Sequence, residues 1–209
     1  GGGERAREGS LRRAVHPAFP SLPAERLVPL PDLFWHPSTL HGQAHVSRVM
    51  VHATHLVEAT GQHALAPRLW AAVFLHDLAR RHDGRCYRHG GHAARRLREE
   101  PALQQRLRDA GLVEADLPAI EAAVTAHSAP GEMKPTHEHW PLTALLKDAD
   151  GLDRVRLGDL DPRYLRHPEA HGMIDFAQAL FYATDGVLAP GEGHFAALWA
   201  EAERLGRVG

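Results

Sequence analysis

The sequence predicts an all-α protein, and two features support that prediction. Apolar residues recur at helical spacing in several segments, as at Val46, Val49 and Ala53, and we find no convincing strand pattern. Proline and glycine stand where helices begin and end: Pro67 suits a first helical turn, and Gly61 suits a helix end. With 209 residues, 44% of them hydrophobic, the chain is long enough to bury one sizeable core.

The expected elements follow from these signals in chain order. Residues 1–10 lack apolar periodicity and are predicted to be a disordered tail, and residues 11–209 are predicted to form one domain. Frequent prolines predict a loop with short helical turns over residues 20–40. We expect helices at about 11–19, 42–60, 67–80, 89–100, 101–110, 116–127, 141–156, 173–183 and 193–205. Residues 40–156 would hold the functional motifs, and residues 157–209 would be a C-terminal helical elaboration joined by loops.

Composition excludes several classes of protein. The formal net charge of -2 gives no reason to expect nucleic acid or an anionic membrane as a partner. The single cysteine excludes an intrachain disulfide and favours a reducing compartment. No apolar run approaches the roughly 20 residues that span a bilayer, and no signal peptide is visible. We therefore expect a cytoplasmic protein; composition does not predict its oligomeric state.

One segment, residues 71–80, carries a histidine and an aspartate into an otherwise apolar helix. His76 and Asp77 follow five residues without a polar side chain, Ala71-Ala72-Val73-Phe74-Leu75, which indicates a buried helix. A buried carboxylate without a partner costs several kcal/mol, and a metal ion is the most direct compensation. Neighbouring polar groups at a helix end are the alternative. Further candidates fall near the ends of other predicted helices: His41, His45, His89, His127 and Asp150.

Three motifs in chain order resemble the HD superfamily of metal-dependent phosphohydrolases. They are His41-Gly42-Gln43-Ala44-His45, then His76-Asp77-Leu78-Ala79-Arg80, then Lys147-Asp148-Ala149-Asp150-Gly151-Leu152-Asp153. The resemblance implies a single helical HD domain with His45, His76, Asp77 and Asp150 as metal ligands. Helical geometry alone does not separate Asp148 from Asp150, and the family arrangement points to Asp150.

The proposed donor set predicts the kind of metal. Two imidazoles and two carboxylates suit a divalent ion such as Mn, Fe, Co, Ni, Zn or Mg, and argue against a thiolate-type site. His89 and His127 match the extra ligands of dinuclear members of the superfamily. We therefore expect one or two ions per chain, with Asp77 as the bridge in the second case. Otherwise His89 and His127 would contact the phosphate of the substrate.

The resemblance also suggests catalytic residues besides Asp77. His41 lies four residues before His45, where phosphodiesterases of the superfamily hold the acid that protonates the leaving group. The alternative is a capping or exposed histidine. Arg81 is the preferred phosphate ligand among the arginines after His76 and Asp77, because a guanidinium group grips phosphate oxygens in pairs. A solvated basic loop is the alternative there.

The expected function is hydrolysis of a phosphomonoester or phosphodiester of a nucleotide or a similar small phosphorylated metabolite. The chain departs from alarmone hydrolases of the superfamily, which carry Glu-Asp where this chain has Arg80 and Arg81. An HD-fold di-iron oxygenase, which uses the same ligands and two further histidines, is the alternative enzyme. A third class, a catalytically idle binding module, is disfavoured because all the core ligands are present.

Overall fold

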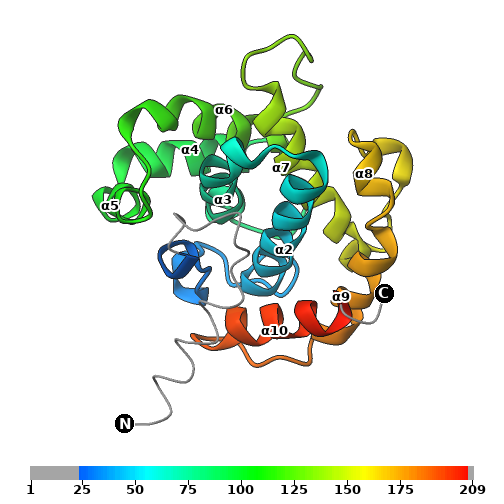
Figure 1. The fold of residues 1–209 in the computed structure, drawn as a ribbon. Helices are drawn as coiled ribbons and strands as arrows, with labels where there is room; N and C mark the ends of the chain where they lie inside the picture. The colour runs from blue at the N-terminus through cyan, green and yellow to red at the C-terminus, as the bar shows by residue number, and fades with distance from the viewer. Residues whose placement is uncertain (1–23, 207–209) are drawn as a thin grey trace.

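The computed structural model describes residues 24–206, and every regular element within this range is a helix (Figure 1). The all-α prediction is therefore confirmed. The predicted tail over residues 1–10 and the short helix over residues 11–19 lie outside the described residues. The proline-rich segment that follows contains two short 3-10 helices, η1 (Ala24–Leu27) and η2 (Pro31–Leu33), as expected.

Proline and glycine mark helix ends where the sequence predicted them. Pro67 lies in the first turn of α3, and Gly61 ends α2 in the left-handed conformation with φ 69°. The α-helices are α2 (Gln43–Thr60), α3 (Ala66–Leu75), α4 (His89–Glu99), α5 (Pro101–Asp109), α6 (Leu117–Ser128), α7 (Trp140–Leu152), α8 (Pro168–His171), α9 (Ile174–Thr184) and α10 (His194–Gly206). The remaining 3-10 helices are η3 (His63–Leu65), η4 (Glu114–Asp116), η5 (Asp153–Leu157) and η6 (Pro162–Tyr164).

Two helices end earlier than the sequence predicted. α3 stops at Leu75, and residues 76–79 form a turn in which the Leu78 N–H bonds the Leu75 carbonyl at 3.1 Å. α7 stops at Leu152 and continues as the 3-10 helix η5. The apolar pattern could not show the first change, because Leu78 and Ala79 in the turn are as fully buried as residues of the helix.

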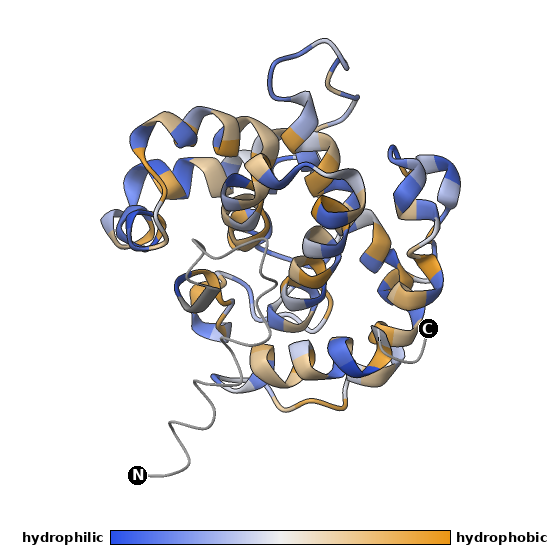
Figure 2. Ribbon diagram, in the orientation of Figure 1, coloured by the Kyte–Doolittle hydropathy of each residue, from blue (hydrophilic) through white to orange (hydrophobic). Residues whose placement is uncertain are grey.

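The core forms where α2, α3, α6 and α7 pack together. α2 contacts α3 and α7, while α6 contacts α3, α4 and α7; α9 and α10 pack on each other and on α2 (Figure 1). Figure 2 shows hydrophobic residues gathered where helices meet. α3 is buried along most of its length, with Trp70 and Phe74 among the largest buried side chains. Its far end therefore carries the next residues, His76 and Asp77, into the interior. None of the described helices is long and apolar enough to cross a membrane.

Gly90 allows α4 to lie directly against the end of α6. A Cβ atom at Gly90 would lie 2.2 Å from the Val124 carbonyl oxygen and 2.8 Å from Ser128 Oγ. At the next residue, Gly91, a Cβ atom would meet nothing within 4 Å. This close approach brings His89, on the first turn of α4, beside His127 near the end of α6.

The two glycines form a matched pair for testing this contact. We expect Gly90→Ala to lower the free energy of unfolding by about 1–3 kcal/mol, because the added methyl group collides with backbone. Gly91→Ala should leave it unchanged or raise it by up to about 1 kcal/mol, since alanine is the better helix former. Urea denaturation of both variants measures the difference. Equal effects would mean that α4 and α6 are farther apart than described.

Candidate metal centre

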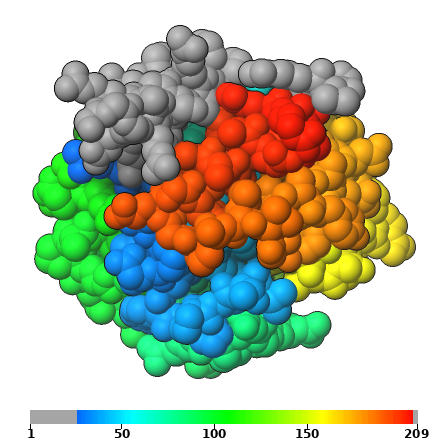
Figure 3. Space-filling view, turned by 90° about the horizontal axis from the view of Figure 1, so that it is seen from below, coloured from blue at the N-terminus to red at the C-terminus, as the bar shows by residue number. Residues whose placement is uncertain are grey.

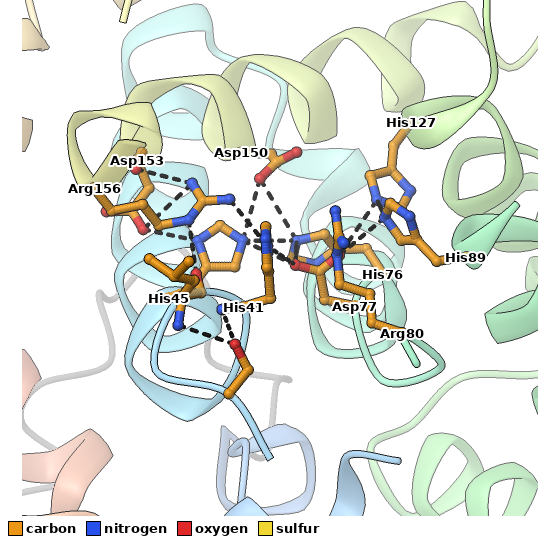
Figure 4. A network of polar contacts seen from close by, with 12 residues as sticks. His41, His45, His76, Asp77, Arg80, His89, His127, Asp150, Asp153 and Arg156 are labelled. Carbon is orange, nitrogen blue, oxygen red and sulfur yellow. Dashed lines mark hydrogen bonds and ion pairs between the residues drawn. The ribbon is translucent and has the colours of Figure 1, made fainter. Parts of the chain in front are cut away.

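Side chains from several helix ends converge on one buried place (Figure 4). They come from α2 and the loop before it, the turn after α3, the first turn of α4, the last turn of α6, and α7. The cluster contains every metal ligand that the sequence predicted, together with His41: His41, His45, His76, Asp77, His89, His127 and Asp150. His45 and His76 are fully buried, and Asp77 is 3% exposed.

Asp77 lies between two groups of histidines. Its Oδ2 atom is 3.3 Å from His45 Nε2 and 3.7 Å from His76 Nε2. Its Oδ1 atom is 3.1 Å from His89 Nε2 and 3.7 Å from His127 Nε2. Each carboxylate oxygen therefore faces a different pair of imidazoles, which is the arrangement that a bridging ligand needs.

Asp150 rather than Asp148 faces the cluster. Asp150 Oδ1 is 3.2 Å from His45 Nε2 and 3.7 Å from His76 Nε2. Asp148 points elsewhere, where its carboxylate accepts hydrogen bonds from the backbone N–H of Arg166, at 2.9 Å, and from the residue after it. Asp148 therefore ties α7 to the segment before α8.

Hydrogen bonds on the outer side of each imidazole aim its Nε2 atom at the cluster. Three histidines bond the carbonyl three residues earlier through Nδ1: His76 to Val73 at 2.6 Å, His89 to Cys86 at 2.8 Å, and His127 to Val124 at 2.5 Å. A carbonyl only accepts, so each Nδ1 carries the hydrogen and a neutral ring presents its Nε2 lone pair inward. Metal-binding histidines use the same outer contact.

His45 is held instead by the carboxylate of Asp153, the last residue of the third motif. His45 Nδ1 donates to Asp153 Oδ2 at 2.7 Å, and Arg48 grips the same carboxylate with bonds of 2.6 and 3.1 Å. All three residues are fully buried. Burial works against the charge of Asp153, but His45 and Arg48 outweigh it and lower its pKa to about 2. The pair of Arg48 and Asp153 thus fixes the orientation of His45.

The spacing of the Nε2 atoms fits bound cations. His45 Nε2 lies 3.2 Å from His76 Nε2, and His89 Nε2 lies 3.0 Å from His127 Nε2. Two lone pairs at such distances repel unless a positive charge lies between them. Two nitrogens bound at right angles to one ion, each at about 2.1 Å, are about 3 Å apart. The buried histidines and aspartates could therefore hold a metal ion.

The ionised carboxylates of the cluster also stabilise positive charge placed among them. Burial and Arg156 lower the pKa of His45, but Asp150, Asp153 and Asp77 outweigh them and raise it to about 9. Burial disfavours the charge of Asp77 and Asp150, yet the facing histidines hold the pKa of each carboxyl well below its ordinary value. Both carboxyl groups are thus ionised, as metal ligands must be.

The arginines are placed differently from the sequence prediction. The guanidinium group of Arg81 lies over the Trp35 ring, 5.2 Å from its centre, and has no described contact with the cluster. Arg80 lies closer: its Nε is 3.4 Å from Asp77 Oδ1. Arg156, which sequence reasoning missed, places Nη2 3.4 Å from His41 Nδ1. The phosphate-binding role predicted for Arg81 stays untested, and the geometry favours its neighbour Arg80.

Comparison of the chain with protein-family models, with curated proteins and with solved structures finds no match. The resemblance to the HD superfamily therefore stays a prediction, carried by the motifs alone.

The bridging position of Asp77 predicts two ions per chain. After chelation and dialysis against Mn²⁺, we expect the wild type to bind two ions and Asp77→Ala to lose metal, because its two oxygens face both histidine pairs. His89→Ala and His127→Ala should each retain one ion. His171→Ala, which changes an exposed histidine on α8, should bind like the wild type. A single ion in the wild type that both His89→Ala and His127→Ala retain would rule out the second position.

Proposed function

We propose that the protein is a metal-dependent phosphohydrolase of the HD superfamily. Its substrate would be a phosphomonoester or phosphodiester of a nucleotide or a similar small phosphorylated metabolite. The observation that carries the proposal is Asp77, whose two oxygens face separate histidine pairs while His41, Arg80 and Arg156 lie beside them. Cationic and imidazole groups next to a carboxylate-bridged centre suit a phosphate ester, which carries negative charge and needs a proton on its leaving group.

Bound divalent ions would supply a water of lowered pKa and would neutralise charge on the phosphoryl group. The arginines add fixed positive charge at the same place. Arg156 is held by the carbonyls of Leu40, at 2.8 Å, and Asp153, at 2.9 Å. Arg80 is likewise held by two carbonyls of the turn that follows it. Such pre-arranged guanidinium groups bind phosphate oxygens with little loss of side-chain freedom.

His41 is the proposed proton donor to the leaving group. Its Nδ1 lies 3.5 Å from Asp77 Oδ2. Burial lowers the pKa of His41, and the charges of Arg80 and Arg156 add to this while Asp77 opposes it. The imidazole is therefore neutral at neutral pH before a substrate arrives. The negative charge of a bound phosphate favours the imidazolium, so that His41 takes up its proton when the substrate is in place.

A polar cavity beside the centre offers space for the rest of the substrate. It has a volume of about 270 Å³, and its lining includes His127, Asp150, Lys147, Arg154 and the exposed Tyr164. Arg166 is a third cation in the lining, and the charges of the three cations are balanced by three aspartates, Asp150, Asp159 and Asp161. Mixed donors and acceptors of this kind suit a ligand with both phosphate and hydroxyl groups.

An activity screen tests the proposed function directly. We expect the protein loaded with Mn²⁺, Co²⁺ or Ni²⁺ to release phosphate from nucleotides or sugar phosphates, or to open cyclic diesters. His76→Ala and Asp77→Ala should abolish turnover, whereas the exposed His171→Ala should retain it. Wild-type turnover no greater than that of these two variants would contradict the proposal. Iron-dependent oxygen uptake without phosphate release would instead support the di-iron oxygenase.

The proposed role of His41 gives a sharper expectation. His41→Ala should keep its metal but lose about 10²- to 10⁴-fold in rate on an alkyl phosphate, because the leaving alkoxide needs a proton. The loss should be much smaller with nitrophenyl phosphate, whose leaving group needs little protonation. Because His41 could also be a ligand together with His45 and Asp77, metal content is measured on the same samples. A loss of metal would instead make His41 a metal ligand, and an equal rate loss on both substrates would mean that it does not protonate the leaving group.

A further inference from the structure

A second cavity lies outside the metal centre. It has a volume of about 540 Å³, opens to the surface, and is lined by the segment of residues 31–39, the first turn of α2, and the loop between α9 and α10. Figure 3 shows the first and last of these segments, in blue and orange, side by side on the face seen from below. None of the candidate metal ligands lines the cavity. It is about twice as large as the polar cavity at the metal centre.

The cavity is held open by side chains that fix its walls. Gln43, on the first turn of α2, donates from Nε2 to the carbonyls of Pro29 at 3.1 Å and Gly191 at 2.7 Å. Its Oε1 accepts from the Gly191 N–H at 3.0 Å. Gly42 packs so closely on the preceding loop that a Cβ atom would lie 2.3 Å from the Ser38 carbonyl oxygen. The walls are therefore joined before any ligand enters.

The lining predicts what the cavity accepts. Its apolar part is built from an aromatic ring, aliphatic side chains and prolines: Pro31, Phe34, Pro37, Ala44, Leu188 and Pro190. No lysine or arginine is among its described lining residues. Asp185 is the charged residue of the lining, and its carboxylate lies 3.5 Å from Arg48 Nη1. An anionic ligand such as a phosphorylated metabolite would find no cation in the walls, so the cavity does not extend the proposed active site.

His194, at the start of α10, supplies one unused polar atom. The residue lines the cavity and is 4% exposed. Its Nδ1 donates to the Ala189 carbonyl at 3.2 Å, which leaves the lone pair on Nε2. That buried Nε2 atom has no hydrogen-bond partner among the described residues. Burial lowers the pKa of His194, and the charge of Arg48 also acts in that direction, so the ring stays neutral and Nε2 stays an acceptor.

We propose that this cavity binds an uncharged, largely apolar small molecule with one hydrogen-bond donor, such as an aromatic hydroxyl group. The donor pairs with Nε2 of His194, and the apolar body of the ligand fills the space between Phe34 and Leu188. A buried acceptor without a partner costs free energy, and a ligand that satisfies it recovers that cost. Pockets that are mostly apolar with a few placed polar groups are the usual form of small-molecule sites.

A pair of matched probes tests both parts of the proposal on the full chain. β-Naphthol carries the hydroxyl donor, and its methyl ether has nearly the same shape without it. By calorimetry we expect β-naphthol to bind the wild type roughly threefold to tenfold more tightly than the ether, the usual range for one net hydrogen bond. On binding, the ¹⁵N signal of His194 Nε2 should move toward the value of a hydrogen-bonded nitrogen.

Three variants separate the acceptor from the cavity. His194→Phe should bind both probes equally, because it keeps a ring and removes the acceptor, and His194→Gln should restore part of the preference. Leu188→Trp should weaken both probes by filling the space. Unchanged metal content and an unchanged circular dichroism spectrum serve as controls for folding. No binding to the wild type, equal affinity for both probes, or binding that Leu188→Trp leaves intact would each overturn the proposal.

Discussion

The arrangement of the central helices depends on one buried, ionised carboxylate, that of Asp77. A charge that is 3% exposed is stable only if other groups replace the water it has lost. Five histidines around Asp77 do so, and they come from α2 and the loop before it, the turn after α3, α4 and α6. Those helices must meet at one point with their ends in register. The helix packing that forms the core therefore also brings these histidines to Asp77.

Local backbone geometry positions several of the side chains in this cluster. At the turn after Leu75, His76 Nε2 lies 3.7 Å from Asp77 Oδ2, so the two side chains enter the cluster together. The absence of a side chain at Gly90 lets α4 approach α6 closely enough for His89 to reach His127. Outer hydrogen bonds then fix the rings, to carbonyls for His76, His89 and His127 and to Asp153 for His45, so that the donor atoms are arranged before any ion binds.

The sequence predicted the helices and the candidate site better than it predicted helix ends and supporting contacts. Apolar spacing locates a helix because it reports a buried face, but Leu78 is buried in the turn as it would be in a helix. The motifs located His45 and Asp150 because ligand spacing is a local property of the sequence. Arg156 was not recognised as part of the site, because its contact with His41 joins residues more than a hundred positions apart. The pairing of Asp153 with His45 spans a similar distance along the chain, so the sequence could not show it either.

α2 links the candidate metal centre to the C-terminal part of the chain. On one side of this helix, His45 faces Asp77 and Asp150. One turn later, Arg48 binds Asp153 and also approaches the carboxylate of Asp185, beyond α9. A fully buried guanidinium group cannot move without leaving its carboxylate unpaired, so a displacement of the segment after α9 would be felt at His45 through Asp153. The segment after α9 thus contacts the same buried arginine that, through Asp153, orients one imidazole of the cluster.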